Sequence, residues 1–180
     1  MKSMMWRWIP WRTVAITTLI GAVVGLSMQG SLVQQILALG LVVWVLGPAA
    51  LFLVIAGLMM MRRDEAERGW LVKLSVIWVF SFLTVAVSMV VGDWVNRYQV
   101  HQTRSYVEEA LPVLDAFHEK SGRYPETLGE AGLDTPPKLL REKGEYSGVA
   151  HTFRFEYWDP AGLMNAYELV GDDREWRAFD

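Results

Sequence analysis

Residues 71–120, LVKLSVIWVFSFLTVAVSMVVGDWVNRYQVHQTRSYVEEALPVLDAFHEK, decide the fold of this chain. Their first part, residues 71–91, contains only one charged residue, Lys73, whereas residues 93–120 carry many charges. Apolar residues nevertheless recur in this second part at intervals of four, four and three, at Tyr106, Ala110, Leu114 and Phe117. This spacing is typical of one face of a helix. We therefore expect one long helix whose first part is compatible with lipid and whose second part packs on a water-exposed domain.

Two residues mark the course of this helix. Pro112 lies inside it and predicts a bend or a break, because proline has no N–H and clashes with the preceding turn. Gly122, which follows Lys120 and Ser121, is placed to end the helix in the left-handed conformation.

Two more apolar stretches precede it, at residues 11–28 and 32–61. A hydrocarbon core of about 30 Å requires about 20 apolar residues in a helix. With residues 71–91, the sequence thus predicts three transmembrane helices within residues 1–91. Gly47-Pro48 near the middle of the second stretch indicates either a kinked or tilted helix or a re-entrant hairpin. Gly25-Leu26-Ser27 leaves a cleaved signal peptide as another interpretation of the N-terminus.

Basic residues in the short connections predict the orientation. Cytoplasmic loops are enriched in Lys and Arg, and the link between the first two stretches, Gly30-Ser31, has no charge. We expect a multi-pass membrane protein with a cytoplasmic N-terminus and an extracytoplasmic domain at residues 92–180. The basic residues lie before the first stretch and around the link between the second and third: Lys2, Arg7, Arg12, Arg62, Arg63, Arg68 and Lys73.

The charge of residues 92–180 limits the function classes. This part has ten basic and seventeen acidic residues, a net charge of −7. Nucleic-acid binding needs clustered Lys and Arg, so we expect no nucleic-acid partner. The chain has no cysteine, which excludes disulfides and thiol catalysis.

Strand patterns follow the helix. In residues 151–158, Phe153, Phe155 and Tyr157 alternate with polar residues, as in a strand with one buried face. Asp159-Pro160-Ala161-Gly162 fits a type I turn. Two further strands are expected at residues 164–170 and 175–179. The predicted fold of residues 92–180 is α+β, a long helix on a three- to four-stranded antiparallel sheet.

No residue set predicts an enzyme. Of the three histidines, His101, His118 and His151, the first two are seventeen residues apart and would lie on different faces of a helix. No cofactor, metal or catalytic group is expected. The paired carboxylates have no nucleophile or histidine partner and are typical of a solvated surface: Glu108 with Glu109, Asp115 with Glu119, and Glu142 with Glu145. Gly21 and Gly25 form a GxxxG pair that is a candidate for helix packing, within the chain or between copies of it in a homo-oligomer.

A short motif carries a resemblance. Residues 114–125, LDAFHEKSGRYP, contain Gly122, Arg123, Tyr124 and Pro125 just after the long helix. This segment resembles the turn that ends the long helix in type II secretion pseudopilins and type IV pilin-like proteins, here behind a three-helix anchor that those families lack. The resemblance implies a small antiparallel sheet after the helix and a role beside a secretion or pilus-like system.

We therefore expect a non-catalytic protein of the bacterial inner membrane that displays a pseudopilin-like domain in the periplasm, where the domain contacts another envelope protein. The alternative from another class is a membrane-anchored immunity or inhibitor protein that protects its host from a toxin.

Overall fold

The computed structural model describes residues 11–60, 65–162 and 165–179, with side chains for residues 12–59, 73–162 and 165–179. The chain divides into two compact units, Met1–Val95 and Asn96–Asp180. We call them the first and the second unit and describe each by itself.

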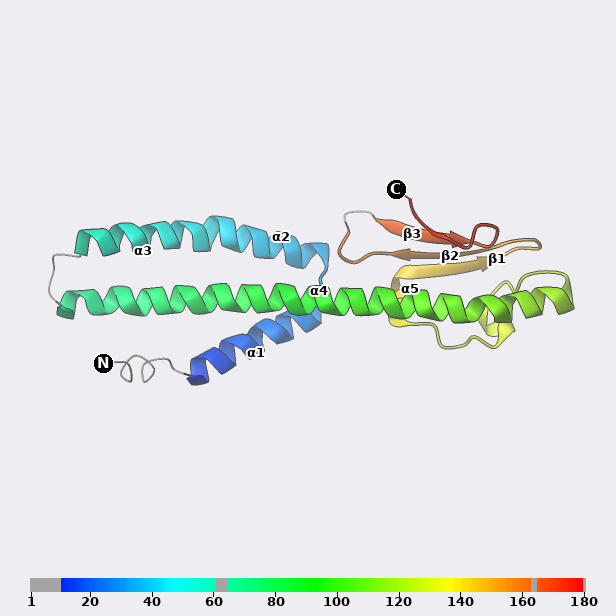
Figure 1. Ribbon diagram of the computed structural model, residues 1–180, viewed down its shortest axis with the longest axis horizontal. Helices are drawn as coiled ribbons and strands as arrows, with labels where there is room; N and C mark the ends of the chain where they lie inside the picture. The colour runs from blue at the N-terminus through cyan, green and yellow to red at the C-terminus, as the bar shows by residue number, and fades with distance from the viewer. Residues whose placement is uncertain (1–10, 61–64, 163–164, 180) are drawn as a thin grey trace. The chain divides into compact units, whose positions relative to one another are not determined.

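The first unit consists of helices (Figure 1). These are α1 (Trp11–Met28), α2 (Leu32–Leu41), the π-helical segment η2 (Val42–Leu46), α3 (Gly47–Met60) and the beginning of α4 (Glu65–Ser121). By length and composition, two helical segments are able to cross a membrane, Leu32–Met59 and Lys73–Ser121. The expectation of three transmembrane helices is corrected to two long apolar helices and one shorter apolar helix. The shorter one, α1, ends at Met28 because Gln29 and Gly30 take positive φ angles of 53° and 71°, which a right-handed helix does not accommodate.

The outer faces of these helices are apolar and exposed. Leu19 is 64% exposed, Leu39 66% and Trp44 80%. A protein surrounded by water rarely exposes a contiguous apolar surface of this extent. The first unit therefore has the surface of a body that contacts an apolar medium or another apolar surface.

A π-helical turn joins α2 to α3. The Gly47 N–H bonds to the Val42 carbonyl, five residues earlier, just before Pro48, which has no N–H. Trp78 of α4 donates its indole N–H to the Leu46 carbonyl at 2.8 Å. A π-helical turn, or a side chain that bonds to a carbonyl of the helix, is a known cause of local bending. The chain stays helical from Leu32 to Met60, as predicted for one kinked helix and not for a re-entrant hairpin.

Helix α4 runs without interruption through 57 residues. It continues past Pro112, so of the predicted bend or break, the break is absent. Proline at this position deprives only the Glu108 carbonyl of its helical donor, and Glu108 is exposed, so water can replace the bond. The helix ends as predicted at Gly122, which has a φ of 73° and donates its N–H to the His118 carbonyl at 2.8 Å.

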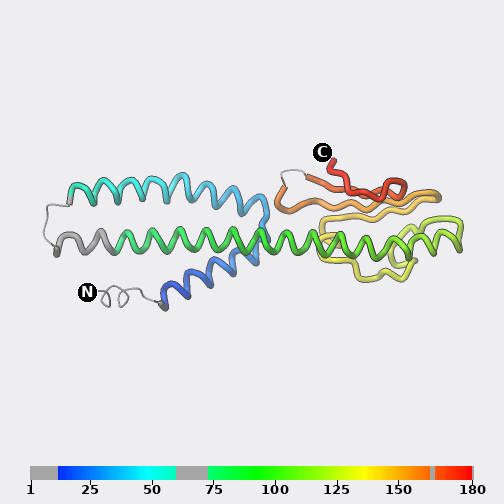
Figure 2. The backbone as a smooth tube through the Cα atoms, viewed as in Figure 1, coloured from blue at the N-terminus to red at the C-terminus, as the bar shows by residue number. Residues whose placement is uncertain are grey.

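The second unit packs the last part of α4 against a four-stranded antiparallel sheet, which confirms the expected α+β arrangement. Its strands are β1 (Gly144–Gly148), β2 (Phe153–Trp158), β3 (Ala166–Val170) and β4 (Trp176–Phe179), in the order β1-β2-β3-β4. Figure 2 traces this meander from yellow to red. The core is formed by one stripe of α4 and the inner sheet face, with Leu140 between them: Val107, Ala110, Leu114, Leu140, Phe153, Phe155 and Leu169.

Three elements of this unit were not predicted by residue number. They are the short 3-10 helix η3 (Leu128–Ala131), α5 (Lys138–Lys143) and strand β1. Strand β1, GEYSG, has only one large apolar residue, Tyr146, so its period-two pattern is weak. Strand β1 is stabilised by its pairing with β2, in which Tyr146 lies opposite Phe155 on the inner face of the sheet. The predicted strands begin one or two residues earlier than β2, β3 and β4 do.

Candidate functional sites

The glycine pair of α1 lies against α4 of the same chain. A Cβ atom at Gly21 would lie 2.6 Å from the Thr84 carbonyl oxygen, and one at Gly25 would lie 2.6 Å from the Ser88 carbonyl oxygen. Both distances are far below ordinary van der Waals contact. Only glycine permits this approach, which is the physical basis of GxxxG packing.

Next to this contact, a buried polar group links α2 to α4. Gln34 is 3% exposed and donates its side-chain N–H groups to the Ser88 carbonyl and to Ser88 Oγ, at 2.7 and 2.8 Å. Its Oε1 accepts the Gly30 N–H at 3.0 Å. Gly92 faces the same group, because a Cβ there would lie 2.6 Å from Gln34 Oε1. Gln34 thus satisfies both a helix carbonyl and the turn between α1 and α2.

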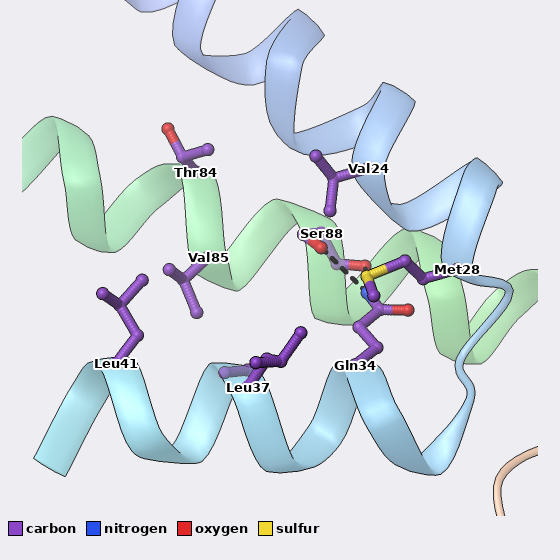
Figure 3. Close-up of a pocket in the computed structure, with 9 residues that line it drawn as sticks. Val24, Met28, Gln34, Leu37, Leu41, Thr84, Val85 and Ser88 are labelled. Atoms are coloured by element: carbon purple, nitrogen blue, oxygen red, sulfur yellow. Dashed lines mark hydrogen bonds between the residues drawn. The ribbon is translucent and has the colours of Figure 1, made fainter.

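An apolar cavity of about 250 Å³ lies beside Gln34. Figure 3 shows Val24 and Met28 of α1, Leu37 and Leu41 of α2 and Val85 of α4 around it, with the bond between Gln34 and Ser88 at one side. The polar atoms of Gln34 are already bonded to Ser88 and Gly30. The cavity therefore suits an apolar occupant and has no group arranged for chemistry.

In the second unit, the predicted turn after α4 is a closely packed structure. Arg123 pairs with Glu130 at 3.2 Å, and the same carboxylate oxygen of Glu130 accepts the Glu126 N–H at 3.2 Å. Pro125 is buried, and its carbonyl accepts the Tyr146 hydroxyl at 3.0 Å. A Cβ at Gly148 would overlap this carbonyl, so the last residue of β1 has to be glycine. The turn is thereby fixed to the sheet.

Tyr124 connects the turn to the core. Its ring stacks on His118 at 4.5 Å between centroids and meets Phe153 edge-on at 4.9 Å. Burial raises the pKa of the Tyr124 phenol, and the neighbouring Asp115 carboxylate adds to the increase. Arg123 lies on the outside, with its guanidinium 5.9 Å from the Phe117 ring. Residues 122–125, which carry the resemblance to pseudopilins, therefore hold the turn against the core. Of the two with polar side chains, Arg123 is more accessible than Tyr124.

Two contacts join the sheet to α4 that sequence patterns did not indicate. Arg174 Nη2 lies 3.0 Å from each carboxylate oxygen of Asp115, which ties the β3–β4 turn to the helix. Arg104 donates to the Tyr157 hydroxyl at 3.2 Å, and its guanidinium lies 5.5 Å from the Tyr167 ring. Burial raises the pKa of Tyr157, although Arg104 opposes this. Sequence offers no direct signal for such pairs, because the partners are more than 50 residues apart.

The outer face of the sheet carries charge. Glu145 lies opposite Glu156, Glu156 opposite Glu168, and Glu168 opposite Arg177. Arg154 bonds to Glu156 at 2.8 Å and to Glu168 at 3.1 Å. Two adjoining hollows of about 270 and 160 Å³ cross strands β1 and β2 on this face.

The remaining predicted residues do not come together as a reactive centre in the described residues. His101 and His151 are exposed, and His118 stacks on Tyr124. Of the carboxylate pairs, Asp115 bonds to Arg174, whereas Glu142 and Glu145 both line one hollow of the outer sheet face. Among the side chains of residues 12–59, 73–162 and 165–179, no group of three or more His, Asp or Glu is arranged to hold a metal ion.

Comparisons with protein families, with curated proteins and with solved structures found no match to this chain. The second unit has the pilin-like shape of a long helix on a four-stranded antiparallel sheet, and that shape is the extent of the likeness.

Proposed function

We propose that this protein is a non-catalytic protein of the bacterial inner membrane that displays its second unit in the periplasm, where the unit contacts another envelope protein. The resemblance of the turn at residues 122–125 to pseudopilins suggests an accessory role in a secretion or pilus-like system.

The composition of α4 is the observation that carries this proposal. Its Lys73–Val91 part exposes Ile77, Val79 and Val90 by 53–70%, whereas Val107, Ala110 and Leu114 of the same helix are completely buried. The first part is thus suited to lipid, and the later part is covered by its own sheet. A helix of this kind is an anchor that continues into a folded domain.

Beside the two long apolar helices, α1 is proposed as a third and shorter crossing. The segment from Leu32 to Met60 contains 29 residues, about 43 Å at 1.5 Å per residue, which exceeds a hydrocarbon core of about 30 Å and requires tilting. Helix α1 has 18 residues, about 27 Å, and packs tightly on α4 through Gly21 and Gly25. The exposed aromatic rings of Trp94 and Tyr98 suit the outer interface.

The orientation follows from the basic residues of the connections. Arg12 precedes most of α1, and Lys73 lies near the start of α4. Lys2, Arg7, Arg62 and Arg63, which contribute most to the argument, lie outside the described residues, as does the side chain of Arg68. The side chains expected at the cytoplasmic interface also lie outside the described part: Trp6, Trp8, Trp11 and Trp70. The positive-inside rule assigns both basic ends to the cytoplasm.

Reporter fusions test the location. Alkaline phosphatase and a fluorescent protein active only in the cytoplasm are fused after Asp180 and, as a control for the opposite side, after Arg63. We expect phosphatase activity only from the fusion after Asp180 and fluorescence only from the fusion after Arg63. Fluorescence from the fusion after Asp180 would place the second unit in the cytoplasm and overturn the proposal.

Contact with an envelope protein is tested separately by photocrosslinking in cells. A photoreactive residue replaces Val149, which is 61% exposed in the β1–β2 connection, or Glu109, which is exposed on α4. The proposal predicts a defined heterologous adduct from at least one position. Adducts of the chain with itself alone would contradict it.

A further inference from the structure

We infer that the outer face of the sheet is a docking surface for a basic segment of the partner protein, with an Arg or Lys side chain held between Glu145, Glu156 and Trp158. This inference rests on the proposed function and specifies the chemistry of the partner.

The surface is a groove formed by the two adjoining hollows, which share Glu145 and Glu156. We call it the sheet groove. One end of it is lined by Glu142, Lys143, Gly144 and Trp158, and the other by Ser147 and Arg154. It crosses strands β1 and β2 on the face that points away from Phe153, Phe155 and Tyr157 of the core.

Two like-charged pairs on this face differ in one respect. Glu156 lies directly opposite Glu168 in β3, and Arg154 bonds to both, at 2.8 and 3.1 Å. Carboxylates directly opposite each other are destabilising unless a cation lies between them. In this pair, the chain supplies its own cation.

The second pair is Glu145 opposite Glu156. Among the described residues, Glu145 has no ion pair or side-chain hydrogen bond, and Lys143, which lines the same hollow, is not paired with it. The charge of Glu145 is therefore not compensated within the described chain. Arg154 lines the same groove but bonds to Glu156 and Glu168, so an Arg or Lys side chain of the partner would give Glu145 its own cation.

Trp158 gives the groove a preference for an organic cation. It follows Glu156 on the outer face of β2 and is 47% exposed, although it is one of the largest apolar side chains. An exposed tryptophan attracts guanidinium and ammonium groups through its ring face. A carboxylate beside an aromatic ring thus matches an Arg or Lys side chain, and the net charge of −7 in residues 92–180 attracts a basic segment at longer range.

Binding of defined peptides to the full-length protein in detergent micelles tests this inference. The probe is a fluorescein-labelled peptide with three arginines separated by serines, and the matched probe has neutral citrulline in place of each arginine. Fluorescence anisotropy at low ionic strength gives the dissociation constants. We expect binding of the arginine peptide only, with an affinity that falls as salt is added.

Two variants locate the site. Glu145→Gln removes an unpaired carboxylate and is expected to weaken binding about fivefold, the value of one exposed ion pair of about 1 kcal/mol. Trp158→Ala is expected to weaken it about two- to fivefold through loss of the cation–π contact. Glu108→Gln, at an exposed position on α4, is the matched control and is expected to leave binding unchanged.

Equal losses in the Glu145 and Glu108 variants would show attraction to acidic surface in general and overturn the inference, as would equal binding of both peptides or no binding of either. Because these measurements use purified protein, their failure is independent of the reporter fusions, which alone decide the location of the second unit.

Discussion

Substitution of Gly25 by alanine tests the packing of the first unit most directly. The added methyl group would lie 2.6 Å from the Ser88 carbonyl oxygen and 2.8 Å from Val91 Cβ. Ordinary contacts between carbon atoms are at about 3.5–4.0 Å, so α1 has to move from α4 by about 1 Å. Overpacking of this kind costs about 1–3 kcal/mol.

The matched control is Gly40→Ala in α2. A Cβ at Gly40 has no other atom within 4 Å. Alanine is favoured over glycine in a helix by about 1 kcal/mol, and both variants gain this. We therefore expect Gly40→Ala to be neutral or slightly stabilising, and Gly25→Ala to be less stable than Gly40→Ala by about 1–3 kcal/mol.

The free energy of unfolding is measured by titrating detergent-solubilised protein with sodium dodecyl sulfate and following tryptophan fluorescence. The contact between α1 and α4 can also be measured directly by crosslinking, because the chain has no cysteine of its own that would react. Cysteines at positions 17 and 84, where Thr84 Oγ1 lies 3.4 Å from the Thr17 carbonyl, are joined with a short thiol-specific reagent. Gly25→Ala should slow this reaction and Gly40→Ala should not. Equal stability and equal crosslinking of the two variants would refute the close contact of α1 with α4.

Four further predictions follow from the contacts described above. Gln34→Leu removes both bonds to Ser88 and leaves the Gly30 N–H without its acceptor, so the midpoint of the same titration should fall by an amount equivalent to about 1–2 kcal/mol, whereas Ser27→Ala, which loses only a bond within α1, should change it little. Trp78→Phe deprives the Leu46 carbonyl of its indole donor and should destabilise the first unit by about 1 kcal/mol; a variant as stable as the parent would contradict a role for this bond at the π-helical turn. Gly148→Ala places a methyl group on the Pro125 carbonyl and should lower the melting temperature of the second unit, followed by near-ultraviolet circular dichroism, while Gly129→Ala, which meets only the movable Asp134 carboxylate, should have a smaller effect. Burial raises the pKa values of Tyr106, Tyr146 and Tyr157 above the usual 10.0, so an unfolded chain would release these protons first; the stability of the second unit should be complete below about pH 10 and fall above it, and Tyr146→Phe should reduce that slope.

Helical periodicity and hydropathy predicted the parts of this protein that depend on local sequence. The apolar stretches became α1, the helical segment from Leu32 to Met60 and the beginning of α4, and the stripe of Ala110 and Leu114 became the core face of α4. Local turn chemistry was also predictable: Gly122 ends α4, and the Gly162 N–H bonds to the Asp159 carbonyl at 3.1 Å. These features arise from interactions within a few residues, which a sequence pattern contains.

The sequence by itself thus determined where the apolar helices lie, although it predicted three spanning helices and two are long enough. It also determined the amphipathic extension of α4 and the alternating inner face of β2. Only the tertiary structure decided that Gly21 and Gly25 face α4 of the same chain, that Gln34 bonds to Ser88, that α4 continues past Pro112, and that Glu145 and Glu156 share a groove. The first, second and fourth depend on atoms that are distant along the chain. The third depends on water, which can bond to the Glu108 carbonyl in place of the missing N–H of Pro112. The contact between Gln34 and Ser88 spans 54 residues, and only packing brings such groups to hydrogen-bonding distance.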